Sequence, residues 1–462
     1  MIPILFAGFV VLSMIVAITD WRRGWLLAIV CGVLQDPVRK LTPGSPVAMT
    51  FTIVAIYIVI MFAVQSRIQR YLRDFSRRFS TIWTMFGLVF LFLVLGAING
   101  LATYGIQYWR APMLSLFTYL APLPAVLLGY MYVDREERLY RFFAFYSIIT
   151  SIALVGSLLE FLRVNWRVLG MVMQVGDYIR HLPGVQIRMI SGFYRAPDIM
   201  GWHAATLTSI ALGMAIRAEL GRRSIPWMFA ASWGFFNCMI SGRRKAIYFV
   251  AVFAAALLLR YFRRLRPAQI VAIMIIAALL GYVVHNISTN ETSSVYASGA
   301  VTTGDEVAQR LEGGLLDTIH QFGLMGAGLG TATQGVQYLL GPNQTTGWQE
   351  GGLGKLAIEL GVPGLLAALV FALIAVWTMM KISAIPDHPC TAQITRVTLF
   401  ALVIANIANF AASAQAYSDP VLTLTTCFIV GCLFATITLD ERVAAATAAA
   451  QPATAQLTPA RA

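Results

Sequence analysis

Residues 82–99 read IWTMFGLVFLFLVLGAIN and carry no charged side chain. A helix needs about 20 mostly apolar residues to cross the hydrocarbon core of a membrane, so this stretch is long enough to span one. The preceding segment, 67–79, reads RIQRYLRDFSRRF and is rich in arginine. Because Lys and Arg gather in cytoplasmic loops, the two segments together predict a membrane helix that begins at a cytoplasmic loop.

The same pattern recurs along the 462-residue chain, which is 58% hydrophobic and 12% charged, with a mean hydropathy of +0.72. A soluble domain carries about twice that charged fraction. Apolar stretches of spanning length lie near 2–19, 47–65, 82–99, 112–133, 142–162, 198–216, 226–241, 246–260, 268–285, 352–380, 395–415 and 420–439. The expected fold class is therefore all-α, a polytopic transmembrane helix bundle of about 12 helices with one large extracytoplasmic loop.

The stretch 24–35 is too short to predict a separate span. It fits a re-entrant piece or a short helix that completes a hairpin with the first helix. The first stretch, 2–18, has no basic start and no clear cleavage site, so we expect it to be a retained helix.

Four basic loops fall on one side of the membrane if the twelve stretches simply alternate. They contain Arg67, Arg70, Arg73, Arg77 and Arg78; Arg135, Arg138 and Arg141; Arg217, Arg222 and Arg223; and Arg260, Arg263, Arg264 and Arg266. That side is expected to be cytoplasmic, which accounts for the formal net charge of +13 without nucleic acid as a partner.

This orientation divides the chain into four parts. Residues 1–285 hold the N-terminal membrane helices, 286–351 the large periplasmic loop, 352–439 the C-terminal membrane helices, and 440–462 a tail rich in Ala, Thr and Pro that is expected to be disordered in the cytoplasm. The five cysteines show no metal-ligand spacing and no readable disulfide framework, so we expect them to fill apolar space.

The segment Ser241-Gly242-Arg243-Arg244-Lys245 places three cations on the outer side, against the positive-inside bias. Such a cluster favours an anionic ligand. The Ser-Gly pair predicts a tight turn whose backbone N–H groups also approach the anion. The alternative is a helix hairpin whose basic side chains extend to the membrane surface.

A second outer cluster surrounds Arg188 and Arg195, just before a helix that begins near Asp198. The helix N-terminus offers free N–H groups to an anion. Asp198 could equally cap the helix, and both arginines could be surface charges. His203, one turn further, is expected to be a packed, hydrogen-bonded residue.

The long loop and the helix after it contain further polar candidates. Arg310 and His320 precede a glycine run, Gly326–Gly330, which predicts a turn and lacks the strand–helix context of a dinucleotide site. Glu350 lies at the mouth of the next helix, as either a general base or an acid favoured by the helix dipole. Lys355 and Glu359 are four residues apart and are expected to pair with each other.

In order and spacing these motifs resemble the O-antigen ligase and O-antigen or exopolysaccharide polymerase superfamily of bacterial inner-membrane proteins. The turn at 240–246 is similar to that family's Gly-Ser-Arg-Gly signature, with Arg244 at its essential arginine. The run 188–198 resembles its other external arginine site, where the family often has Asn in place of Asp198. Arg310, the glycine run and 359–364 resemble the end of its periplasmic loop. The similarity covers roughly residues 185–380.

One departure concerns the base. The family's His-Asn pair falls on Glu350-Gly351, so Glu350 stands where the ligases carry a histidine. Either a carboxylate does that work here or the chemistry differs.

The resemblance implies transfer of a glycan from undecaprenyl diphosphate to a hydroxyl of an acceptor glycan or lipid, by a metal-independent and cofactor-free glycosyltransferase. It assigns catalysis to Glu350 and Arg244, and diphosphate binding to Arg188, Arg195, Arg243, Arg244 and Arg310. Arginine suits the leaving diphosphate because its fork binds phosphate oxygens and stays charged. Membrane lipids and other polysaccharide assembly proteins are the further partners expected.

Two other functions remain open on the sequence. A transporter or flippase of lipid-linked glycans should show paired broken helices in two halves, with polar groups at mid-membrane, and the sequence shows no such pairing. A non-catalytic component of a polysaccharide export system is the third. If the chain is a glycan transferase, the missing histidine favours a polymerase over a ligase.

Overall fold

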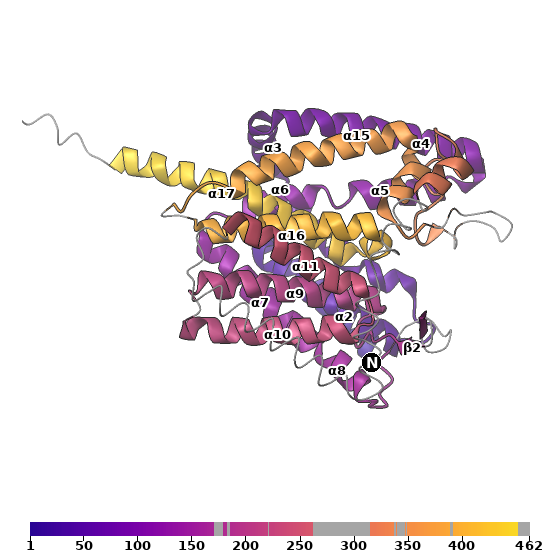
Figure 1. The fold of residues 1–462 in the computed structure, drawn as a ribbon, viewed down its shortest axis with the longest axis horizontal. Helices are drawn as coiled ribbons and strands as arrows, with labels where there is room; N and C mark the ends of the chain where they lie inside the picture. The colour runs from indigo at the N-terminus through magenta and orange to yellow at the C-terminus, as the bar shows by residue number, and fades with distance from the viewer. Residues whose placement is uncertain are drawn as a thin grey trace, which may run out of the picture.

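The computed structural model describes residues 1–170, 179–182, 185–219, 221–261, 315–336, 339, 347, 349–388 and 391–450. These residues are mainly helical (Figure 1). One short antiparallel hairpin joins β1 (Ile179–Leu182) to β2 (Val185–Arg188), with Ile179 opposite Arg188.

The helices follow one another along the chain. They are α1 Ile2–Thr19, α2 Trp21–Leu41, α3 Thr52–Arg78, α4 Ser80–Tyr104, α5 Arg110–Leu120, α6 Pro124–Tyr132, α7 Glu136–Ala153, α8 Val155–Phe161, α9 Pro197–Arg217, α10 Ile225–Ile240, α11 Arg244–Tyr261, α15 Gly352–Ser383, α16 Gln393–Ala412 and α17 Pro420–Ala450. Short 3-10 turns, η1 Val47–Phe51, η2 Ile106–Tyr108, η3 Arg222–Ser224 and η6 Gln415–Ser418, lie between some of them.

Within the described ranges, nine helical segments are long and apolar enough to cross a membrane. They indicate a membrane-embedded protein, in agreement with the composition. Most of the expected apolar stretches form helices where the sequence predicts them, while 268–285 and most of the expected loop 286–351 lie outside the described residues.

Two of the expected spans are each divided into two helices. The stretch 112–133 becomes α5 and α6, and 142–162 becomes the end of α7 and α8. Pro122 lies in the first break and Pro124 begins α6; neither has an N–H to donate, so one regular helix cannot continue through them.

The C-terminal segment differs from the prediction. Residues 440–450, expected to belong to a disordered tail, continue α17 to Ala450. This run is mostly alanine, the residue with the strongest helix preference, so local composition is enough to extend the helix.

The stretch 24–35 lies within α2, a helix of 21 residues. The carboxylate of Asp20 accepts hydrogen bonds from the N–H groups of Arg22 and Arg23, at 3.1 and 3.3 Å, and caps its start. Asp20 is the one residue between α1 and α2, and α2 runs back along α1. It therefore completes a hairpin with α1.

Contacts between loops define two ends of the bundle. At one end Arg22 pairs with Asp134 at 3.3 Å, Arg217 with Glu136 at 3.0 Å, and Arg78 with Glu441. We call this the basic end, on the left of Figure 1. Of the arginines expected on one side, Arg78 and Arg217 lie together at this end as predicted, whereas Arg263, Arg264 and Arg266 lie outside the described residues.

The opposite end carries the starts of α9, α11, α15 and α17, and we call it the site end. α2 reaches it too, because Asp36 contacts Arg195 just before α9. α2 therefore runs from one end of the bundle to the other, and Met1 lies toward the site end (Figure 1).

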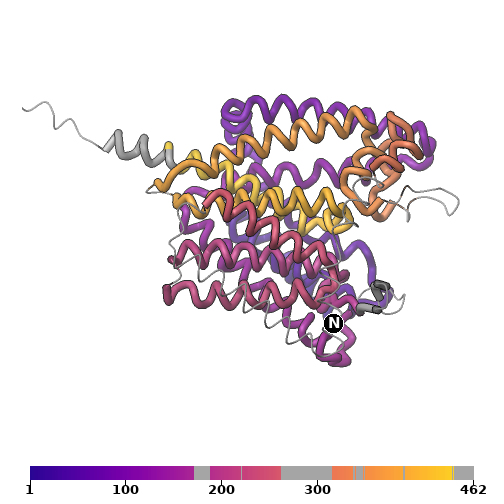
Figure 2. The backbone as a smooth tube through the Cα atoms, viewed as in Figure 1, coloured from indigo at the N-terminus to yellow at the C-terminus, as the bar shows by residue number. Residues whose placement is uncertain are grey.

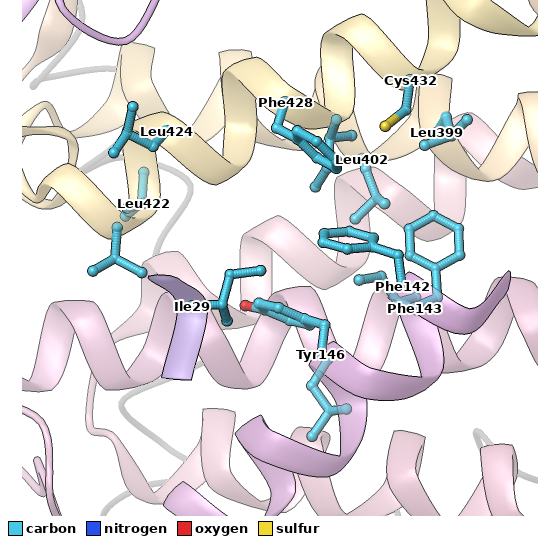
Figure 3. Packing of buried hydrophobic residues seen from close by; sticks show 14 of the residues in the cluster. Ile29, Phe142, Phe143, Tyr146, Leu399, Leu402, Leu422, Leu424, Phe428 and Cys432 are labelled. Carbon is cyan, nitrogen blue, oxygen red and sulfur yellow. The ribbon is translucent and has the colours of Figure 1, made fainter. Parts of the chain in front are cut away.

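The core is centred on α9, which contacts α7, α10, α11 and α16. Of the 18 most apolar consecutive residues of α9, 94% are buried. Aromatic residues fill the space between α2, α7 and α17. Trp25 stacks on Phe428 with ring centroids 4.8 Å apart. Phe142 contacts the ring of Phe428 as well, and Figure 3 shows these two rings. This packing makes α9 a fixed support for the residues at its start.

The glycine segment, residues 323–336, lies among α4, α5 and α15 at the site end (Figure 2). Its predicted turn is confirmed, because Gly326, Gly328 and Gly330 have φ of +67°, +89° and +97°. The N–H of Ala327 donates to the carbonyl oxygen of Ile358 and that of Leu329 to Gly96, both at 2.8 Å. Non-helical backbone at membrane depth needs partners within the protein, and here α4 and α15 accept its hydrogen bonds.

The helix beside this segment is itself broken. α15 has a non-helical residue at Gly361, with φ 70° and ψ 176°, just before Pro363. The N–H of Val362 donates to the carbonyl oxygen of Leu324 at 2.8 Å instead of to its own helix. The break in α15 and the glycine segment therefore satisfy each other's backbone groups.

Replacing Gly328 by alanine tests this contact. A Cβ there would lie 2.2 Å from the backbone nitrogen of Gly100, so G328A should lower the free energy of unfolding by about 2–4 kcal/mol, from left-handed strain and overpacking together. Gly323, with φ +72° and open space around a Cβ, is the matched control, and G323A should cost only about 1–2 kcal/mol. Equal losses in unfolding in detergent would mean that the close approach to α4 contributes nothing.

Candidate functional site

The turn that leads into α9 is held by two buried charges. The ammonium of Lys40, at the end of α2, donates to the carbonyl oxygens of Gly192 and Tyr194, both at 2.7 Å. The carboxylate of Glu160, in α8, accepts from the N–H groups of Ser191 and Gly192 at 3.1 and 2.6 Å. We call these two residues the charge clamp. Its contacts fix the backbone that positions Arg195.

Arg195 lies between two buried carboxylates. Its guanidinium contacts Asp419, at the start of α17, at 2.5 Å and Asp36 of α2 at 3.4 Å, and its own N–H donates to Asp36 at 3.0 Å. Burial lowers the pKa of Arg195, but the carboxylates of Asp419 and Asp36 raise it above its ordinary value. Arg195 therefore stays charged, and two acids already offset that charge.

Sequence reasoning missed Asp36 and Asp419. Both lie at the edge of apolar stretches, and an acid at membrane depth with a cation nearby is the available signal. The pairing of these two acids with Arg195 could not be predicted, because the three residues are far apart in the chain.

The charge clamp gives a stability prediction. K40M should lower the free energy of unfolding by about 3 kcal/mol or more, because two buried carbonyls lose a charged donor and Glu160 loses a nearby cation. Unfolding of the purified protein in detergent measures the loss. The exposed Lys381 supplies the control, and K381M should change the unfolding free energy by less than about 0.5 kcal/mol. If the two variants unfold alike, the clamp does not hold the turn.

The start of α9 meets the turn between α10 and α11. The carboxylate of Asp198 pairs with Arg243 at 2.8 Å and with Lys245 at 3.4 Å, and Lys245 also contacts the hydroxyl of Ser413. We call Asp198, Arg243, Lys245 and Ser413 the polar cluster. Asp198 does not cap α9, whose N-cap is Ala196, because its side chain is directed to these cations instead.

The expected tight turn before α11 is confirmed. Gly242 has a φ of +66°, and the N–H of Arg243 donates to the hydroxyl of Ser241 at 3.1 Å. Arg244 is the first residue of α11 and is 7% exposed. The turn thus brings three consecutive cations to the start of one helix.

Glu350 joins this group from the other side. Its carbonyl oxygen accepts a hydrogen bond from Ala414 at 2.8 Å, next to Ser413, and its carboxylate interacts electrostatically with Lys245. Helices α9, α11 and α15 therefore begin close to the same polar cluster. Each helix start carries a partial positive charge, which adds to that of the cations.

The other candidate residues lie elsewhere. Arg188 ends β2 as an exposed residue, and His320 is exposed in the helix formed by 315–322. Arg310 lies outside the described residues. His203 is packed as expected, with its Nδ1 2.9 Å from the hydroxyl of Tyr146 and its ring stacked on Tyr194.

The expected pair of Lys355 and Glu359 is wrong. Glu359 instead accepts hydrogen bonds from Tyr119, Thr333 and Ser115 at 2.6, 2.7 and 3.2 Å, and from the N–H of Ala332 at 3.3 Å. The ammonium of Lys355 lies over the ring of Tyr119, 5.2 Å from its centroid. Hydroxyl groups from α5 and the glycine segment have taken the place of the lysine.

No family model matches the chain, and no curated protein or solved structure is detectably similar to it. Any inference about function therefore rests on the geometry of the polar cluster and Glu350. This geometry offers cations, helix starts and a carboxylate at one end of a membrane bundle. Such a group can bind a phosphate-containing ligand and accept a proton beside it.

Proposed function

We propose that the chain is a membrane glycan transferase of the O-antigen ligase and polysaccharide polymerase type. The donor would be a glycan on undecaprenyl diphosphate, and the acceptor a hydroxyl of another glycan or of a lipid. The observation that carries the proposal is the convergence of Glu350 with Lys245 and Arg243 at the starts of three helices. It rests also on the similarity of motifs at 188–198, 240–246 and 326–364.

The two ends of the bundle support a proposed orientation in the membrane. Basic loops favour the cytoplasm, so the basic end would face it and the site end would face the periplasm. A bacterial inner membrane is the setting in which a lipid-linked glycan meets such a site. Membrane lipids and other assembly proteins are the further partners proposed.

In the proposed reaction the acceptor hydroxyl attacks the anomeric carbon of the donor glycan. A new glycosidic C–O bond forms while the bond from that carbon to the diphosphate oxygen breaks. Glu350 accepts the hydroxyl proton, and the lipid diphosphate leaves with the bonding electron pair. Arg243 and Arg244 stabilise the charge that develops on the diphosphate, with about 1.5–3 kcal/mol from each charge-assisted contact.

Asp198 has a further part in this scheme. Its carboxylate pairs with Arg243 and Lys245, where a phosphate group would bind. The ligand has to replace these internal ion pairs, which favours a dianionic diphosphate over a weaker anion. Arg195, held by Asp36 and Asp419, would support the start of α9 more than it would bind the diphosphate.

The alternative of a transporter or flippase would place polar groups near mid-membrane. The ion pairs of the described residues gather at the two ends of the bundle instead. This distribution favours chemistry at a membrane surface. Lipid analysis of a deletion strain separates polymerase from ligase: single repeat units on the carrier indicate the first, and full-length lipid-linked polymer the second.

R244A tests the diphosphate site. We expect it to abolish polymer or conjugate formation while the amount of protein in the membrane stays the same, because a leaving diphosphate loses its stabilising cation. Glycan output on a gel and immunoblotting of membranes measure the two quantities. K381A, at the far end of α15, should leave both unchanged. Wild-type glycan output from R244A would contradict the proposal.

E350Q tests the base. An amide cannot accept the proton, so glycan output should fall by about 100-fold or more, while E350H should recover part of it. The assay is formation of product from a lipid-linked donor by the purified protein in detergent. Wild-type turnover by E350Q would show that another group removes the proton.

A further inference from the structure

Within the described part of the chain, the ammonium of Lys355 has no hydrogen-bond acceptor. The residue is 5% exposed and sits in the first turns of α15. Among the residues that the structure describes, no carboxylate lies within ion-pair distance of its ammonium and no group accepts a hydrogen bond from it; the ring of Tyr119 is its one described partner. A buried ammonium normally makes hydrogen bonds, and an acceptor on a bound ligand would provide them here.

Glu359, the acid one helical turn further along α15, does not fill this role. Glu359 is fully buried, and its two oxygens already accept four hydrogen bonds from Tyr119, Thr333, Ser115 and the backbone of Ala332. The hydroxyl of Tyr119 donates a hydrogen bond to Glu359, and the ring of Tyr119 lies under the ammonium of Lys355. A ring face attracts a cation but cannot accept three N–H donors.

The start of α15 provides a second, independent feature. Its N-cap is Gly351, and no side chain caps it. The first N–H groups of a helix have no partner within the helix, and together with the helix dipole they favour an anion. Lys355 is the fourth residue of α15, so its backbone lies about one turn from this uncapped start.

We propose that Lys355 and the start of α15 form a further binding site for the phosphate group of a lipid. The phosphate would supply acceptors to the ammonium and to the free N–H groups of the helix. It belongs either to the headgroup of a membrane phospholipid or to the lipid-linked donor; only the second source rests on the proposed function. Lys355 lies five residues after Glu350 on one helix start, so the site adjoins the polar cluster.

The test uses the full chain, purified in detergent and titrated with inorganic pyrophosphate, with thermal unfolding as the readout. K355M, which keeps the length of the side chain without its charge, should raise the apparent dissociation constant about tenfold, the loss of one charge-assisted contact. K355R should bind within about threefold of the wild type. K381M is the control: Lys381 lies over Trp377 at 5.3 Å on the same helix but is exposed, and it should have no effect.

The second arm replaces detergent by nanodiscs without pyrophosphate. Stabilisation by phosphatidylglycerol over phosphatidylcholine that is lost in K355M identifies the phospholipid headgroup as the source. Weaker pyrophosphate binding by K355M in the first arm identifies the diphosphate of the lipid-linked donor as the source. If K355M matches the wild type in both arms, the ammonium is solvated by water and the inference is wrong.

R244A separates this result from the proposed function. Loss of pyrophosphate binding in R244A, with K355M unchanged in both arms, would remove the Lys355 site and leave the transferase proposal standing. Unfolding of K355M without any ligand controls for folding, and we expect its midpoint to equal or exceed that of the wild type, because a buried charge has been removed.

Discussion

The position of the candidate site depends on two buried charges, Lys40 and Glu160, that hold one turn of backbone from opposite sides. Lys40 satisfies the carbonyl groups and Glu160 the N–H groups. In a low-dielectric interior, unsatisfied backbone groups would be costly, so this arrangement locks the turn. α9 begins directly after it, and the placement of Arg195 and Asp198 follows from that start.

Electrostatic balance governs the residues around α9. Asp36 and Asp419 offset Arg195, and Asp198 offsets Arg243 and Lys245. These pairs allow cations to remain charged at the edge of a membrane, where isolated charges are expensive. They also set the strength of ligand needed, since an incoming anion must compete with acids already in place. Lys355 stands apart, because Glu359, one turn further along α15, accepts hydrogen bonds from hydroxyl groups instead.

Irregular backbone is essential to the other half of the site end. The glycine segment and the break at Gly361 exchange hydrogen bonds with each other and with α4. Neither could exist alone in lipid, because each leaves groups that only the other satisfies. This mutual dependence fixes where α15 begins, and thereby where Glu350 and Lys355 lie.

Local properties could be read from the sequence: helices from runs such as 82–99, the grouping of basic loops, the turn at Gly242, and the glycine turn at Gly326–Gly330. The length of α2, the partners of Arg195 and the separation of Lys355 from Glu359 could not. Hydropathy and turn chemistry act over a few neighbouring residues. Which acid meets which cation depends on how helices far apart in sequence pack, and Tyr119 of α5 could displace a predicted i,i+4 pair because only the tertiary structure brings it there.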